Sequence, residues 1–256
     1  MQSGINVVLA PEQLGTLFGI PITNTLITSW AVIAILLVVA VLIGSRLKLT
    51  PSRFQLLFEW LVEFIYDYVA ETLESRELAR TFFPYITTIF LFVFTSNLLE
   101  FTPGVGSLGF FGTGGFTPLF RSVNTDLNVT LMLAILSFVT IEVTGVVVIG
   151  AWRYAGKFVT FHGHGIGQRL INFFIGIIEL FSEIMRIVSF SFRLFGNIFA
   201  GETVILVVTY FIPYLGPVPI MAFEIFVGFV QAAIFAMLTL FFIKIATMEP
   251  HGAEAH

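Results

Sequence analysis

The chain has 256 residues, of which 57% are hydrophobic and 11% are charged. Soluble domains carry about 25% charged residues, so this composition excludes a soluble globular protein and predicts an integral membrane protein. The absence of cysteine excludes disulfides, thiolate metal sites and a catalytic thiol. The formal net charge of −4 decides little, because most charges lie in loops and in one amphipathic stretch.

A membrane span and a surface helix are the first predicted elements. Residues 1–25 form a tail without Lys or Arg, so we expect no cleavable signal peptide, and residues 26–44 are apolar enough to span a membrane. Residues 54–78 alternate apolar positions with acidic ones at helical spacing, namely Glu59, Glu63, Asp67, Glu71 and Glu74. This pattern predicts an amphipathic helix on the membrane surface, either docked to a partner or simply exposed to solvent.

Residues 82–101 and 127–150 are the next predicted spans, with the glycine-rich loop 102–124 between them and the basic loop 151–169 after them. Loop 44–53 is also basic. Because Lys and Arg accumulate in cytoplasmic loops, both basic loops are expected inside the cell. The N-terminal tail and the glycine-rich loop are then outside, while the surface helix and the C-terminus are cytoplasmic.

Two short motifs in the loops resemble ligand-binding motifs, but neither is interpreted as a binding site. The glycines at 104, 106 and 109 match the letters of the dinucleotide-binding fingerprint, but no strand or βαβ unit surrounds them, so that match is rejected. His162 and His164 have a spacing that suits a metal, yet no further ligand lies nearby. We interpret them as polar loop residues and expect neither a metal nor a cofactor.

The last two apolar segments, 170–212 and 217–248, are too long for upright spans, which need about 20 residues. Surplus length is accommodated by tilting or bending. The sequence therefore predicts an all-α integral membrane protein forming a single membrane domain over 1–256. It has five transmembrane helices and one amphipathic surface helix, and the last two helices are long and strongly inclined.

Arg193 lies deep inside the first of these long segments. An arginine at the centre of a membrane helix costs at least ~2.5–3.5 kcal/mol on insertion scales. Its guanidinium cannot lose its proton to avoid that cost. A permanent cation in this position therefore predicts a functional site.

Further polar residues share the predicted helical face of Arg193 at about 100° per residue. They lie within roughly 80° of its direction and are Glu179, Ser182, Glu183, Arg186, Ser189 and Asn197. Glu202 points to nearly the opposite side, and the next helix carries Glu224 and Gln231 on one face. Hydrogen bonding between helices is one explanation. Four carboxylates and two arginines on adjacent segments favour an ion path, in which an arginine acts as a barrier or charge partner.

These residues resemble subunit a of the F-type ATP synthase membrane sector. The resemblance is carried by RLFGNIFAGE at 193–202 and by TDLNVT at 125–130. It also extends over the span from Phe83 to Gly104 and over QAAIF at 231–235, so that it covers about residues 80–245 in the expected order.

The resemblance implies a stator beside a rotating ring of c subunits, each carrying one carboxyl group. Arg193 would be the essential arginine that faces this carboxylate and separates two aqueous half-channels. Glu202, Glu224 and Gln231 would border the outer half-channel, and Glu179, Ser182 and Ser189 would line the cytoplasmic one. Asn197, Glu183 and Arg186 would also belong to the ion path. The family often pairs an acid with a histidine where this chain has Glu202 and Glu224.

The same resemblance implies partners and a location. The chain would contact the c-subunit ring, b-type peripheral stalk subunits, the remaining ATP synthase subunits and the lipid bilayer, with no nucleic acid. It would lie in a bacterial inner membrane and contribute to ion transport rather than to the chemistry of ATP.

Two other functions compete with this one. A secondary transporter would show internal repeats, which the sequence lacks. An intramembrane hydrolase would need a Ser/His pair or a metal cluster in a span, but all four histidines lie in a loop or the tail, namely His162, His164, His251 and His256.

Overall fold

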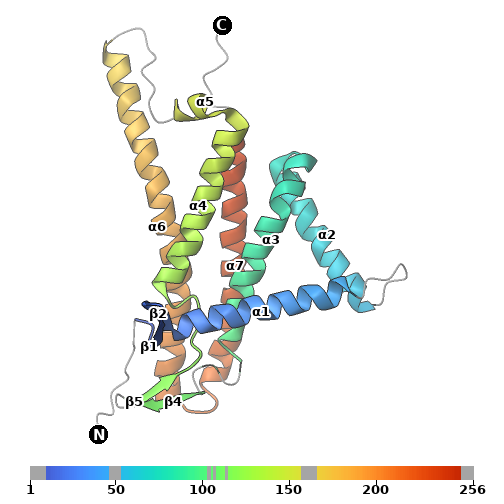
Figure 1. The fold of residues 1–256 in the computed structure, drawn as a ribbon, viewed down its shortest axis with the longest axis vertical. Coiled ribbons are helices and arrows are strands. Elements are labelled where there is room, and N and C mark those ends of the chain that lie inside the picture. Colours follow the sequence, from blue (N-terminus) through green and yellow to red (C-terminus); the bar gives the residue numbers. More distant parts are fainter. Residues whose placement is uncertain are drawn as a thin grey trace.

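The computed structural model describes residues 10–45, 53–102, 105, 108–112, 115–156 and 166–248. Over these ranges the chain is mainly helical, with two short antiparallel hairpins (Figure 1). The helices are α1 (Asn24–Gly44), α2 (Arg53–Leu73), α3 (Arg76–Leu99), α4 (Leu127–Ile149), α5 (Ala151–Ala155), α6 (Ile166–Phe211) and α7 (Pro217–Thr247). The hairpins pair β1 (Gln13–Leu17) with β2 (Ile20–Thr23), and β4 (Gly109–Gly112) with β5 (Gly115–Pro118).

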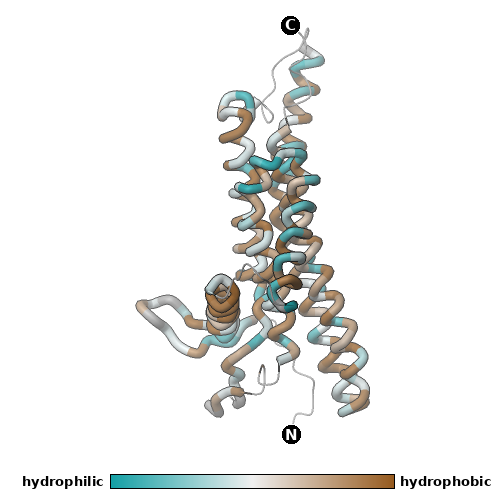
Figure 2. Tube along the Cα trace, turned by 90° about the vertical axis from the view of Figure 1, so that its right-hand side faces the viewer, coloured by the Kyte–Doolittle hydropathy of each residue, from teal (hydrophilic) through white to brown (hydrophobic). Residues whose placement is uncertain are grey.

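The helices α3, α4, α6 and α7 run side by side as a bundle (Figure 1). Its core has two parts. One lies between α2, α3, α4 and α7 and includes Val69, Ile86 and Leu240. The other lies between α3, α4, α6 and α7 and includes Val93 and Leu194. The outer surface is also apolar, as the largely brown helices of Figure 2 show, and this suits contact with lipid.

The helix α1 crosses the bundle instead of joining it, and Figure 2 shows it almost end-on beside the upright helices. Its N-terminal end is tied to the segment before α4, because the Thr25 hydroxyl donates to Asp126 at 2.7 Å and the Arg121 backbone N–H donates to Thr28 Oγ1 at 3.1 Å. The rest of α1 exposes apolar side chains such as Val41. Because α1 crosses the direction of the bundle, the two cannot both stand perpendicular to the plane of a membrane. At least one of them is therefore inclined to it.

Four described helices are long and apolar enough to cross a membrane by length and composition, namely α1, α3, α4 and α7. The predicted all-α membrane class is confirmed, whereas the number of five spans stays a prediction. Helix α6 is continuous over 46 residues, which corresponds to about 69 Å at 1.5 Å per residue. That is more than twice the ~30 Å hydrocarbon core, as the predicted inclination of this segment requires.

Some predicted boundaries need correction. The surface helix was expected over 54–78, but α2 ends at Leu73 and α3 starts at Arg76, six residues before the expected start of that span. The break is local: Glu74 adopts φ +53, and the Ser75 side chain caps α3 by accepting from the Leu78 N–H. The β-hairpins in the N-terminal tail and the glycine-rich loop, and the short α5, were not predicted.

Close packing of α3 on α7 depends on Gly228. The Asn97 amide donates to the Gly228 carbonyl at 2.9 Å and accepts from the Asn124 amide at 2.7 Å. A Cβ at position 228 would lie 2.9 Å from Asn97 Cβ, too close for two carbon atoms. The glycine therefore lets the backbone of α7 approach the polar end of α3.

Replacing Gly228 with alanine is expected to destabilise the fold by about 1–3 kcal/mol, because the added methyl forces α3 and α7 apart. The thermal unfolding temperature of the detergent-solubilised complex measures this effect. Gly44→Ala is the matched control, since a Cβ at the end of α1 meets nothing within 4 Å. Equal stability of the two variants would contradict the packing role of Gly228.

Candidate functional site

The structure divides the predicted polar face of α6 in two. The side chains of Ser182, Ser189, Arg193 and Asn197 are exposed along one side of the helix. Glu183 is buried at 3% exposure. It lies at the edge of the predicted stripe, where α6 packs on the rest of the bundle, so the stripe is not a single continuous lining.

Arg193 is exposed on α6, on the same side as the exposed Ser189 and Asn197. Its guanidinium donates to Ser189 Oγ at 3.2 Å. It also borders a small cavity together with Gln231 of α7, which is buried. No carboxylate pairs with Arg193 among the residues that the structure describes. Its charge is therefore uncompensated within the described part of the chain.

The buried Glu183 belongs to a second polar cluster between α4, α5 and α6. Arg186 forms an ion pair with Glu183 at 2.6 Å and lies 3.7 Å from the centre of the Phe242 ring. The Tyr154 hydroxyl of α5 donates to Glu142 of α4 at 3.0 Å. Burial, followed by the negative charge of Glu142, raises the pKa of Tyr154.

The sequence did not point to Tyr154. In the structure its ring fills the space beside Gly145, where a Cβ would lie 2.2 Å from the ring. Gly145, one helical turn after Glu142, indicates that another side chain packs closely there. The sequence does not indicate which side chain it is.

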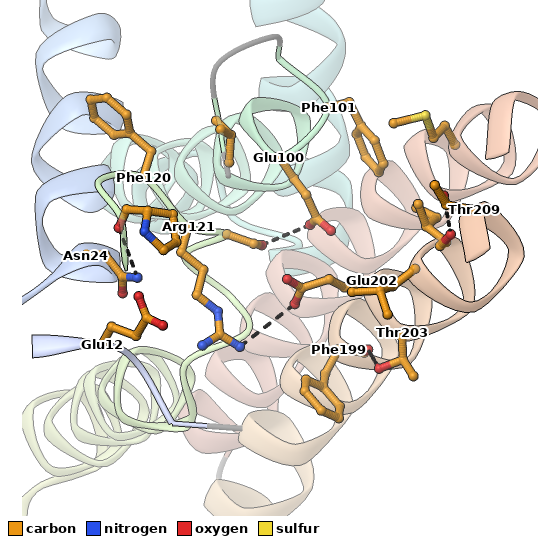
Figure 3. A pocket seen from close by; sticks show the side chains of 16 residues that line it. Glu12, Asn24, Glu100, Phe101, Phe120, Arg121, Phe199, Glu202, Thr203 and Thr209 are labelled. Atoms are coloured by element: carbon orange, nitrogen blue, oxygen red, sulfur yellow. Dashed lines mark hydrogen bonds and ion pairs between the residues drawn. The ribbon is translucent and has the colours of Figure 1, made fainter. Parts of the chain in front are cut away.

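A cavity of about 470 Å³ lies at the other end of the bundle (Figure 3). Glu100, at the end of α3, Arg121, in the segment before α4, and Glu202 of α6 converge on it. The Ser122 hydroxyl donates to Glu100 at 2.9 Å, and an Arg121 nitrogen lies 4.0 Å from a Glu202 oxygen. Glu12, from the N-terminal segment, adds a further carboxylate to the lining.

Glu224 of α7 lies against α6 beside this cavity. A Cβ at Gly201 would lie 2.2 Å from its carboxyl carbon, so the Glu224 carboxylate lies directly on the α6 backbone, one residue before Glu202. The predicted neighbours Glu202 and Glu224 are thus brought together. Gln231 is placed with Arg193 instead.

Glu202 and Arg193 lie on different parts of α6. They are nine residues apart, which is about 13 Å along the helix axis and half a turn in direction. Glu202 lines the acidic cavity, whereas Arg193 lies on the exposed face. This placement agrees with the expectation from the sequence that Arg193 and Glu202 point to opposite sides of the helix.

No role was predicted from the sequence for Arg121 or for Glu100. Each lies in a different segment from Glu202, and only the folded chain brings them together. No group of three or more His, Asp or Glu side chains suits a metal ion in the part of the chain that the structure describes. His162 and His164 lie outside the described residues.

Comparison with known proteins identifies the family. The family described as "ATP synthase A chain" matches residues 26–244. Among similar proteins, "ATP synthase subunit a, sodium ion specific" of Propionigenium modestum is 32% identical over 92% of this chain and 78% of its own length. "ATP synthase subunit a" of Geotalea daltonii is 32% identical over 87% of both chains, and that of Moorella thermoacetica is 28% identical over 91% of this chain and 94% of its own. The chain therefore belongs to the ATP synthase A chain family and is a multi-pass membrane subunit of the ion-translocating sector of that complex.

Proposed function

We propose that this chain is the stator of the proton-translocating sector, in which Arg193 separates two aqueous half-channels that lead to a rotating ring of c subunits. The observation that carries the proposal is the exposed guanidinium on a long, largely apolar membrane helix, α6, which has no carboxylate partner among the described residues. Such a charge is costly in a membrane unless an anion compensates it. A carboxylate on each passing c subunit supplies that anion.

The acidic cavity is the proposed outer half-channel. It offers carboxylates from Glu100 and Glu202, and Glu224 lies beside it against Gly201. Protons move between such carboxylates and water. Gln231 and Asn197 lie farther along, near Arg193, and would line the last step toward the ring.

The cytoplasmic half-channel is proposed along the other end of α6. Ser182 and Ser189 are exposed on the same side as Arg193. The Glu183–Arg186 pair is packed beside them, and Glu179 lies one turn earlier. An arginine cannot join a proton relay, because it keeps its proton. Arg193 therefore blocks direct passage, and protons have to travel on the ring.

The proposed orientation follows from the basic loops 44–53 and 151–169, which would be cytoplasmic in a bacterial inner membrane. The N-terminus would be outside and the C-terminus inside. The amphipathic α2 would lie on the cytoplasmic surface, where b-type stalk subunits and the rest of the complex are accessible. Each charge that crosses 100 mV delivers about 2.3 kcal/mol. This is too little energy to make one ATP, so the ring has to carry several protons for each ATP.

Disulfide cross-linking tests the proposed contact with the ring. The chain has no native cysteine, so an introduced thiol is its only one. Asn197→Cys, on the Arg193 side of α6, is expected to cross-link on oxidation to a cysteine placed next to the carboxylate of the c subunit. Met132→Cys is the matched control, because Met132 is 72% exposed but lies on α4. Absence of the Asn197 cross-link, or equal cross-linking at Met132, would contradict the assigned face.

A further inference from the structure

We propose that Arg121 is a positioning residue of the outer half-channel, whose fixed positive charge stabilises the ionised form of the Glu202 carboxylate. This inference rests on the proposed function of the acidic cavity. It assigns to Arg121 a role in proton transfer in addition to its part in packing.

The first argument is the surroundings of Glu202. Its side chain is 37% exposed, but its Oε2 atom is buried and has no hydrogen-bond donor in the described structure. A buried carboxylate without donors binds a proton unless a nearby cation stabilises its charge. The Arg121 guanidinium, 4.0 Å away, is that cation.

The second argument is the way in which Arg121 is held. Its side chain is 11% exposed, and one guanidinium nitrogen donates to the Ala10 carbonyl at 2.9 Å. Its backbone N–H donates to Thr28 of α1. The guanidinium is thus fixed between the N-terminal segment and α6. It cannot titrate, so its charge is the same at every physiological pH.

The third argument is the balance of charge around the cavity. Besides Glu202, the cavity is lined by Glu12 from the N-terminal segment and Glu100 from the end of α3, and Glu224 of α7 lies against the backbone of Gly201. Several carboxylates so close together do not all ionise without a counter-charge. Arg121 supplies it on the Glu202 side, while Glu100 accepts a hydrogen bond from Ser122. Arg121 therefore favours the release of a proton from Glu202 to the next group on the path.

The test is a double-mutant cycle between Arg121→Gln and Glu202→Gln, measured as ATP-driven proton pumping in sodium-free membrane vesicles. In the native background, Arg121→Gln is expected to lower the maximal rate about tenfold. The alkaline limb of the pH profile should move to higher pH, because Glu202 then keeps its proton at higher pH. In the Glu202→Gln background, Arg121→Gln should have little further effect.

Arg121→Lys separates charge from packing. It keeps the positive charge but loses the planar group, and we expect it to pump faster than Arg121→Gln with a nearly native pH profile. Equal losses for Lys and Gln, or the same Arg121→Gln loss in both backgrounds, would overturn the proposal and leave Arg121 with a packing role. A complex that fails to assemble with Arg121→Gln in both backgrounds would overturn it as well. Native pumping by Arg193→Ala would instead refute the proposed half-channels.

Discussion

Replacing Arg193 with alanine is expected to abolish coupled ATP synthesis while the complex still assembles. Assembly should survive because the side chain is exposed, and it donates a hydrogen bond to Ser189 on the same helix rather than to a residue of another element. Activity should be lost because the guanidinium favours the ionised form of the ring carboxyl that passes it and so forces proton release. We expect the rate of synthesis to fall by at least about 10²-fold, as when a preorganised charge is removed from an active site.

The same substitution should leave passive proton leak intact or increase it. The fixed cation repels protons in a low-dielectric gap, and its removal opens that gap while the carboxylates of the outer cavity remain. Proton permeability of vesicles that contain the assembled complex, together with their rate of ATP synthesis, measures both effects.

Arg193→Lys is the companion variant, and we expect incomplete rescue. A lysine can lose its proton in such a gap and lacks the planar group that pairs with a carboxylate. If Arg193 only held helices together, its loss would reduce the yield of complex and leave activity in proportion to that yield. An assembled Arg193→Ala complex that makes ATP at a substantial rate would refute the mechanism.

The helices were largely predictable from the sequence because their signals are local. Runs of apolar residues gave α1, α4 and α7, and the acidic spacing gave α2. The break after α2 was missed, because it depends on one residue, Glu74, in a left-handed conformation. In the structure this turn is also held from a distance, since Lys244 of α7 forms an ion pair with Glu74 at 2.5 Å and lowers its pKa.

The site was predictable only where a single helix carries it. Helical spacing placed Arg193 and Glu202 on opposite sides of α6, as the structure does. The acidic cavity, in contrast, brings together the N-terminal segment, the end of α3, the segment before α4, and α6. Contacts between segments so far apart leave no periodic signal, so Arg121 and Ser122 were missed. The crossing of α1 over the bundle was missed for the same reason.

The second large effect is expected from the acids of the proposed outer half-channel. Glu202→Gln and Glu224→Gln should each lower the rate of proton pumping without preventing assembly, and the double variant should be slower than either. Glutamine keeps the size of the side chain, and neither position lies in the buried cores. The loss should therefore come from the missing proton acceptor and not from misfolding.

The structure gives the reason for partial redundancy. The Glu224 carboxylate lies against Gly201, and Glu202 is the next residue along α6, so one acid remains at this point of the path when the other is neutralised. A positioned proton-transfer group contributes about 10²–10⁴-fold. We expect the double variant to lose at least about 10²-fold and each single variant clearly less. Proton pumping in membrane vesicles, normalised to assembled complex, decides the matter, and native pumping by the double variant would remove both residues from the path.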